Sequence, residues 1–166
     1  MTLEHATIYL AIFTAVAAGG TFWLAWESRK SSYRQIGVQT WLELERRFDS
    51  VEMKQARRKL AHQLKDYTSA KHSKISETVL NFFESAGIAY KEGLLGEELA
   101  RSSFSFHACR WWEASRAYIL QEQKRHGEDT TLYEDFGDMV LKLRLPGEVI
   151  DDDEIRRFLE DEAKLD

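Results

Sequence analysis

The side chains that could bind a metal or act as a nucleophile are few and scattered along the chain. They are five histidines and one cysteine. His107 and Cys109 are two positions apart, so on a helix their side chains point about 200° from each other, and one zinc ion could not easily bind both. Cys109 as a nucleophile would need a base beside it. The phosphate-binding, dinucleotide-binding, serine-hydrolase and zinc-protease motifs are absent. We therefore expect no metal, no cofactor and no catalytic group.

Charged side chains are the next candidates, and Glu84 is the most interesting of them. It follows two phenylalanines and precedes three small residues, so we expect it to face a neighbouring helix. Arg57 or Arg58, on the preceding amphipathic segment, is its predicted partner. Glu113 and Arg116, beside two tryptophans, predict a second pair. A buried carboxylate needs a partner whatever its role, so both pairs are interpreted as structural.

Charge is spread unevenly, although the net charge is only −5. The tail over residues 147–166 has nine acidic and three basic residues, so the rest of the chain sums to +1. That balance argues against a nucleic-acid partner. Residues 46–59 are locally basic, which fits either contact with anionic lipid headgroups or a solvated face with intrahelical pairs. Phe158 and Leu159 in the acidic tail favour docking, on this domain or on another chain.

Residues 6–26 form an uncharged run of twenty-one residues. As a helix this run would be roughly 31 Å long, which matches the hydrocarbon core of a bilayer. Tyr9 at one end and Trp23 and Trp26 at the other are aromatic residues suited to the two interfaces. A signal peptide would want basic residues before the run, and a buried core helix is seldom so long. The run predicts a transmembrane anchor.

The charges around this run predict its orientation. Three basic residues follow it at once and none precedes it: Arg29, Lys30 and Arg34. The N-terminus is therefore expected outside and the C-terminal domain in the cytoplasm, with the protein a single-pass component of the inner membrane. Small residues four apart predict a contact face for another helix in the membrane: Ala11, Ala15 and Gly19.

Helical spacing of apolar residues continues through the rest of the chain, and no stretch has the alternation of a strand. We expect an all-α protein, with one N-terminal transmembrane helix and a cytoplasmic bundle of about five or six helices. The expected division is an anchor over 1–30, a bundle over 31–146 and an acidic helix or tail over 147–166. Helices of the bundle are expected near residues 41–48, 50–64, 76–92, 97–125, 132–143 and 152–164.

Short motifs in the middle of the chain resemble a known family. They are the Phe-Phe-Glu of residues 82–84, the Gly-Leu-Leu of 93–95 and the Trp-Trp of 111–112. The chain resembles bacterial membrane-anchored helical proteins that are grouped only as a domain of unknown function. The resemblance implies an N-terminal span followed by a helical domain. It implies no activity.

Three functions remain open. The first is a non-enzymatic accessory or scaffold subunit of a larger bacterial membrane-associated assembly, with membrane lipids and other membrane-protein subunits as partners. The second is a membrane-tethered enzyme or effector with a site near Glu84, His107 and Glu113. The third is a sensor of anionic lipid surfaces. The absence of a catalytic motif favours the first.

Overall fold

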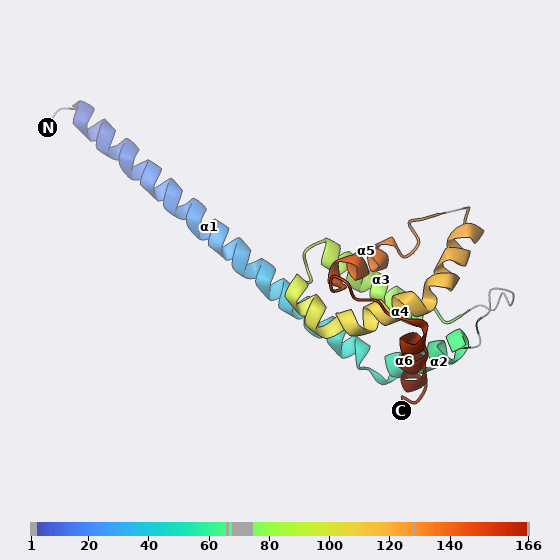
Figure 1. Ribbon diagram of the computed structural model, residues 1–166. Coiled ribbons are helices and arrows are strands. Elements are labelled where there is room, and N and C mark those ends of the chain that lie inside the picture. The colour runs from blue at the N-terminus through green and yellow to red at the C-terminus, as the bar shows by residue number, and fades with distance from the viewer. Residues whose placement is uncertain (1–2, 66, 68–74, 128, 166) are drawn as a thin grey trace. The chain divides into compact units, whose positions relative to one another are not determined.

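The computed structural model describes residues 3–65, 67, 75–127 and 129–165 (Figure 1), and side chains of the first helix only over 20–29 and from 35 onward. These residues form six helices and contain no strand, so the predicted helical bundle is confirmed. The helices are α1 (Leu3–Phe48), α2 (Val51–Lys65), α3 (Thr78–Lys91), α4 (Glu97–Arg125), α5 (Glu134–Leu143) and α6 (Asp152–Glu162). The chain divides into two units, residues 1–36 and 37–166.

The predicted membrane span over residues 6–26 is contradicted. In the part of the chain that the structure describes, no helix is long and apolar enough to cross a membrane. The predicted single-pass location in the inner membrane, and the orientation derived from it, are corrected by the same finding.

The residues predicted as the membrane contact face and as one aromatic belt lie where side chains are not described. They are Tyr9, Ala11, Ala15 and Gly19, and the same holds for Lys30 and Arg34, two of the basic residues expected to set the orientation. Trp23, Trp26 and Arg29 are described and are exposed, with Trp23 at 68% and Trp26 at 61%. The backbone of α1 is helical through residues 28–35.

The core of the second unit is aromatic. Phe82 and Phe83 of α3 are fully buried, as are Phe104 of α4 and Phe136 of α5. Phe83 stacks on Phe136, with ring centroids 5.1 Å apart. Phe48, at the end of α1, meets both α3 rings and Phe104 at tilted or edge-on angles, the geometries that aromatic quadrupoles favour. This cluster joins α1, α3, α4 and α5 within the unit.

Helices α3 and α5 pack with their backbones unusually close, and a glycine permits this. A Cβ atom on Gly87 would lie 2.3 Å from the carbonyl oxygen of Asp135 and 2.8 Å from the nitrogen of Phe136. Both of those atoms belong to the backbone of the first turn of α5, which cannot move aside as a side-chain tip could. Any larger residue at position 87 would force the two helices apart.

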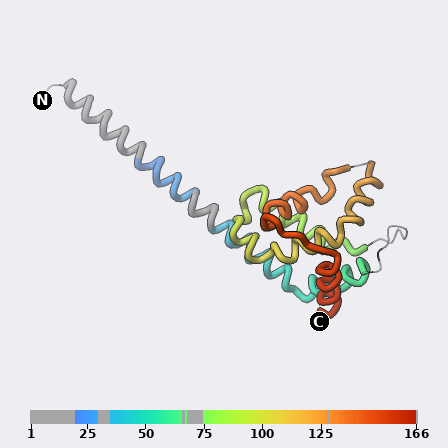
Figure 2. The backbone as a smooth tube through the Cα atoms, viewed as in Figure 1, coloured from blue at the N-terminus to red at the C-terminus, as the bar shows by residue number. Residues whose placement is uncertain are grey.

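Two of the glycines end the helices that precede them. Gly93 has φ +69° and Gly127 has φ +80°, the left-handed conformation that a residue without Cβ adopts at little cost. The amide of Gly93 donates to the carbonyl of Tyr90, 3.1 Å away, which satisfies a terminal acceptor of α3. The chain then turns toward α4, whose long course is traced in Figure 2.

Candidate functional site

The acidic C-terminal helix α6 packs on α2 and α4 of its own domain. Its first turn carries Asp152, Asp153 and Glu154, and the Asp151 side chain caps it by accepting a hydrogen bond from the Glu154 amide at 2.7 Å. Acidic residues at a helix N-terminus are favourable because the helix dipole is positive there. Docking on this domain or on another chain was left open by the sequence, and the structure shows docking on this domain.

Only three of the eleven residues of α6 are buried: Phe158, Leu159 and Glu162. Their spacing of three and four residues places them on one face of the helix. The face is apolar apart from one carboxylate. The receiving surface on α2 and α4 must therefore supply an apolar seat and a cation, and we call this surface the α6 groove. It is formed by Arg57 on α2 and by Phe106, His107, Arg110 and Trp111 on α4.

Arg57 supplies the cation. Its Nε donates to Oε2 of Glu162 at 2.7 Å, and its Nη2 donates to Oε1 at 2.6 Å. Both residues are only 5% exposed, so this is a buried, two-pronged ion pair. The Arg57 guanidinium also lies over the ring of Phe48, 4.3 Å from its centroid. The planar fork of an arginine matches a carboxylate in this way, and a lysine could not make both contacts.

His107 adds an acceptor beside the ion pair. Its Nε2 lies 3.4 Å from Nη2 of Arg57 and 3.6 Å from Oε1 of Glu162. Burial lowers the pKa of His107 to about 4, and the positive charges of Arg57 and Arg110 contribute to this. The imidazole is therefore neutral near pH 7. Because a guanidinium only donates, Nε2 accepts from Arg57 and the ring proton lies on Nδ1.

The apolar seat receives Phe158. Its ring packs edge-on against Trp111, with centroids 5.1 Å apart, and meets Phe106 and His107 at 6.2 Å. Trp111 is fully buried. Arg110 covers the outer face of Phe106, with its guanidinium carbon 3.7 Å from the ring centroid, and forms an ion pair with Glu154. The seat thus combines aromatic surface with cationic edges.

A pocket of about 580 Å³ opens along this contact. Three arginines line it, opposed by three carboxylates, and His107 is neutral there. The pocket therefore has no excess charge with which to attract a small ion. Neither Glu84 nor Glu113 is among its lining residues.

Glu84 has a different partner from the one predicted. It accepts a hydrogen bond from the backbone amide of Phe136 at 2.8 Å, and so caps the N-terminus of α5. Tyr133, the residue at the cap position itself, has φ +62° and makes no side-chain cap bond. Burial raises the pKa of the Glu84 carboxyl, and the bond from Phe136 offsets part of that rise. Arg57 binds Glu162 instead, and Arg58 donates to the carbonyl of Leu165 at 3.1 Å.

Glu113 binds Arg144, which follows α5, and also lies 3.7 Å from Arg116 on its own helix. Glu84, His107 and Glu113 therefore have separate sets of partners and do not form one site. Burial raises the pKa of the Cys109 thiol, which keeps it protonated and unreactive.

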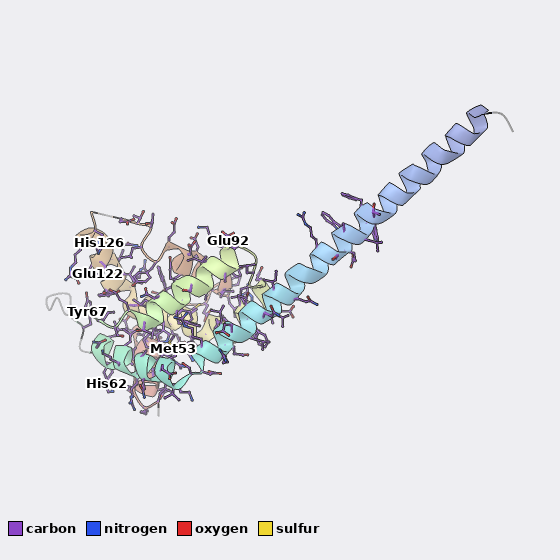
Figure 3. All side chains as sticks on the ribbon, turned by 180° about the vertical axis from the view of Figure 1, so that it is seen from behind. Met53, His62, Tyr67, Glu92, Glu122 and His126 are labelled. Atoms are coloured by element: carbon purple, nitrogen blue, oxygen red, sulfur yellow. The ribbon has the colours of Figure 1, made fainter. Side chains whose placement is uncertain are left out.

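No group of three potential metal ligands occurs among the described residues. His62 lies on α2 and His126 follows α4 (Figure 3), and Nε2 of His126 lies 4.0 Å from Glu122.

Sequence reasoning missed the pairing of Arg57 with Glu162, although a signal was present. Met53, Arg57, Leu60 and Leu64 recur at intervals of four, three and four residues, so the arginine occupies an apolar position of α2. Glu162 takes the equivalent place on α6, three and four residues beyond Leu159 and Phe158. A charged residue on each buried face is a hint that the two faces meet.

Comparison with known proteins adds one finding. Residues 6–143 match a family described as Domain of unknown function (DUF4760), and this range includes all of α2 to α5 but not α6. No curated protein and no solved structure matches the chain. The match covers well over half of the sequence, including the motifs at residues 82–84, 93–95 and 111–112. The chain belongs to the DUF4760 family.

Proposed function

We propose that the chain is a non-enzymatic accessory subunit whose helical bundle binds a partner protein. One observation carries the proposal: the surface formed by α2 and α4 already recognises a helix, α6, through an aromatic seat and a buried arginine. Helix-in-groove contacts of this kind are a common mode of protein recognition. Tryptophan and arginine are enriched among the interface residues that contribute most to binding energy, and this surface carries one of each, Trp111 and Arg57.

An enzyme site near Glu84, His107 and Glu113 has less support. The three side chains contact different elements, and a histidine with a pKa of about 4 is a weak general base near neutral pH. A lipid-binding face over residues 46–59 also has less support. Arg57 is buried there, and Arg46 pairs with Glu43 at 3.3 Å.

Native isolation of the full chain from its own cells tests the proposal. We expect wild-type chain in a stable complex of defined mass. Phe106→Ser, which removes an exposed part of the groove, should release the chain from that complex. Leu120→Ser is the matched control, because Leu120 is similarly exposed on α4 (50% against 54%) but lies about 21 Å further along the helix. Repeated recovery of the wild-type chain alone under gentle conditions would contradict the proposal.

A further inference from the structure

We propose that α6 is an exchangeable occupant of the α6 groove, and that the partner protein enters the groove as an acidic amphipathic helix in place of α6. The entering helix would carry an aromatic residue four positions before a glutamate, as α6 does with Phe158 and Glu162. This inference rests on the proposed function, because it names the site and the chemistry of the partner contact.

The groove requires a carboxylate from whatever occupies it. Arg57 is 5% exposed and its guanidinium has donors directed at both oxygens of Glu162. A buried guanidinium without an anion is strongly unfavourable, so an apolar or basic helix could not take the place of α6. His107 cannot substitute for the anion, because it is neutral and accepts only one bond.

The groove also fixes where the aromatic side chain must lie. The ring of Phe158 is held edge-on by Trp111, one helical turn before Glu162 reaches Arg57. A spacing of four residues places the two side chains on the same face of a helix.

Basic residues near the two ends of the docked helix favour further acidic residues on whatever helix occupies the groove. Arg110 forms an ion pair with Glu154, near the start of α6. Arg58 donates to the Leu165 carbonyl, just beyond its end. A cation therefore stands near each end of the docked helix, which suits an acidic segment and disfavours a basic one.

Two features make α6 replaceable. The first is that α6 is held by only three buried residues. One of them forms an ion pair, and the cost of desolvating the two charges offsets much of the attraction between them. The second is its position in the chain. Every groove residue lies within the range matched by the family, 6–143, whereas α6 lies beyond it. The groove therefore lies within the family match, and its occupant lies outside it.

The linker before α6 also allows release. Residues 144–151 contain no helix, and Leu145 and Val149 in it are 59% and 82% exposed. Phe158 and Leu159 of α6 belong to the same buried core as Phe82, Phe83 and Phe136, but they are the only buried apolar residues of α6.

The test adds a labelled peptide with the sequence of residues 150–165 to the full-length chain and measures fluorescence anisotropy. In the wild-type chain the peptide must compete with its own tethered copy, so binding is weak. Glu162→Gln weakens the tethered copy, while the peptide still brings its carboxylate to Arg57. We expect this variant to bind the peptide at least 10-fold more tightly than wild type. Glu160→Gln is the matched control, being the same change on α6 outside the buried face, and should behave as wild type.

Two results would overturn the proposal. One is that Glu162→Gln binds the peptide no better than Glu160→Gln does. The other is that it binds equally well a peptide in which the residue matching Glu162 is glutamine, since the carboxylate would then be irrelevant. If Glu162→Gln does not fold, hydrogen–deuterium exchange of the α6 amides in the wild-type chain provides the test. Saturating peptide should remove the protection of these amides, and unchanged protection would contradict the replacement of α6 by the peptide.

The occupant could instead come from a second copy of the chain. In that case the purified wild-type chain would form a dimer that the peptide dissociates, and this result would overturn the assignment to a partner protein. Failure of the proposed function is distinguishable from failure of this inference. If the native complex persists in Phe106→Ser and the peptide does not bind, the α6 groove is not the partner-binding site. The chain would still be a subunit that binds a partner elsewhere.

Discussion

Replacing Glu162 by glutamine should cost the folded chain about 3 kcal/mol, because the change leaves Arg57 buried without its anion. The structure sets this magnitude. The side chains of Arg57 and Glu162 are 7% and 6% exposed, and two charge-assisted hydrogen bonds of 2.7 and 2.6 Å join them. Breaking one member of such a pair costs roughly 3–5 kcal/mol. The lower end applies under the proposed exchange, because a detached α6 would leave Arg57 hydrated and would limit the loss to what docking of α6 contributes.

The partner substitution completes a double-mutant cycle. Arg57→Met alone should be similarly harmful, because it leaves the Glu162 carboxylate buried and unpaired. Arg57→Met combined with Glu162→Leu should lie within about 1–2 kcal/mol of wild type, since apolar residues of similar size can replace a buried ion pair at little cost. The coupling between the two positions is then large and favourable to the pair.

Urea unfolding of the full chain, followed by circular dichroism at neutral pH, measures each free energy of unfolding. Glu160→Gln, on the same helix, should change the free energy by less than about 0.5 kcal/mol. A loss below about 1 kcal/mol in Glu162→Gln, or single effects that simply add in the double variant, would refute the buried pair as described.

Three further predictions follow from neighbouring features. His107 has a pKa of about 4 when folded and about 6.5 when unfolded, so as pH falls the unfolded chain binds a proton first and the free energy of unfolding decreases between these two values. The decrease from pH 7 to pH 5 should be about 2 kcal/mol. Urea unfolding of His107→Gln at the two pH values should not show this decrease. Gly87→Ala should lower the free energy of unfolding by about 3 kcal/mol, because its Cβ would lie 2.3 Å from the Asp135 carbonyl; thermal melting measures this. Glu84→Ala should cost about 1 kcal/mol and speed amide exchange at Phe136, whereas Glu84→Gln, which still offers an acceptor, should cost less.

The helices of the bundle could be predicted because their signals are local. Apolar spacing marks α2 to α6, and Gly93 and Gly127 end two of them through a backbone conformation that other residues adopt at greater cost. The structure places α3 at Thr78–Lys91 where the sequence indicated 76–92, a difference confined to the ends. Such signals need no knowledge of distant residues.

The contacts between helices could not be predicted in the same way. Arg57 and Glu162 are 105 positions apart, and Glu84 is 52 positions from the Phe136 amide that it accepts from. A carboxylate at Glu84 is satisfied equally well by a cation or by a helix N-terminus, and residue type alone does not decide between them. The close approach at Gly87 depends on the backbone of α5, which its own neighbours in the sequence do not reveal.

Hydropathy misled at the N-terminus. The run over residues 6–26 meets the length rule for a span, but in the part of the chain that the structure describes no helix is long and apolar enough to cross a membrane.

Site-specific photo-cross-linking in the cell tests the role of the groove most directly. A photoreactive phenylalanine analogue replaces Phe106, whose ring contacts Phe158 of the docked α6, and in a second chain it replaces Leu120 further along α4. The groove predicts a covalent adduct with a partner protein from position 106, through an acidic helical segment of that partner, and none from position 120. Cross-links from position 106 that reach only α6 of the same chain, or equal adducts from both positions, would contradict it.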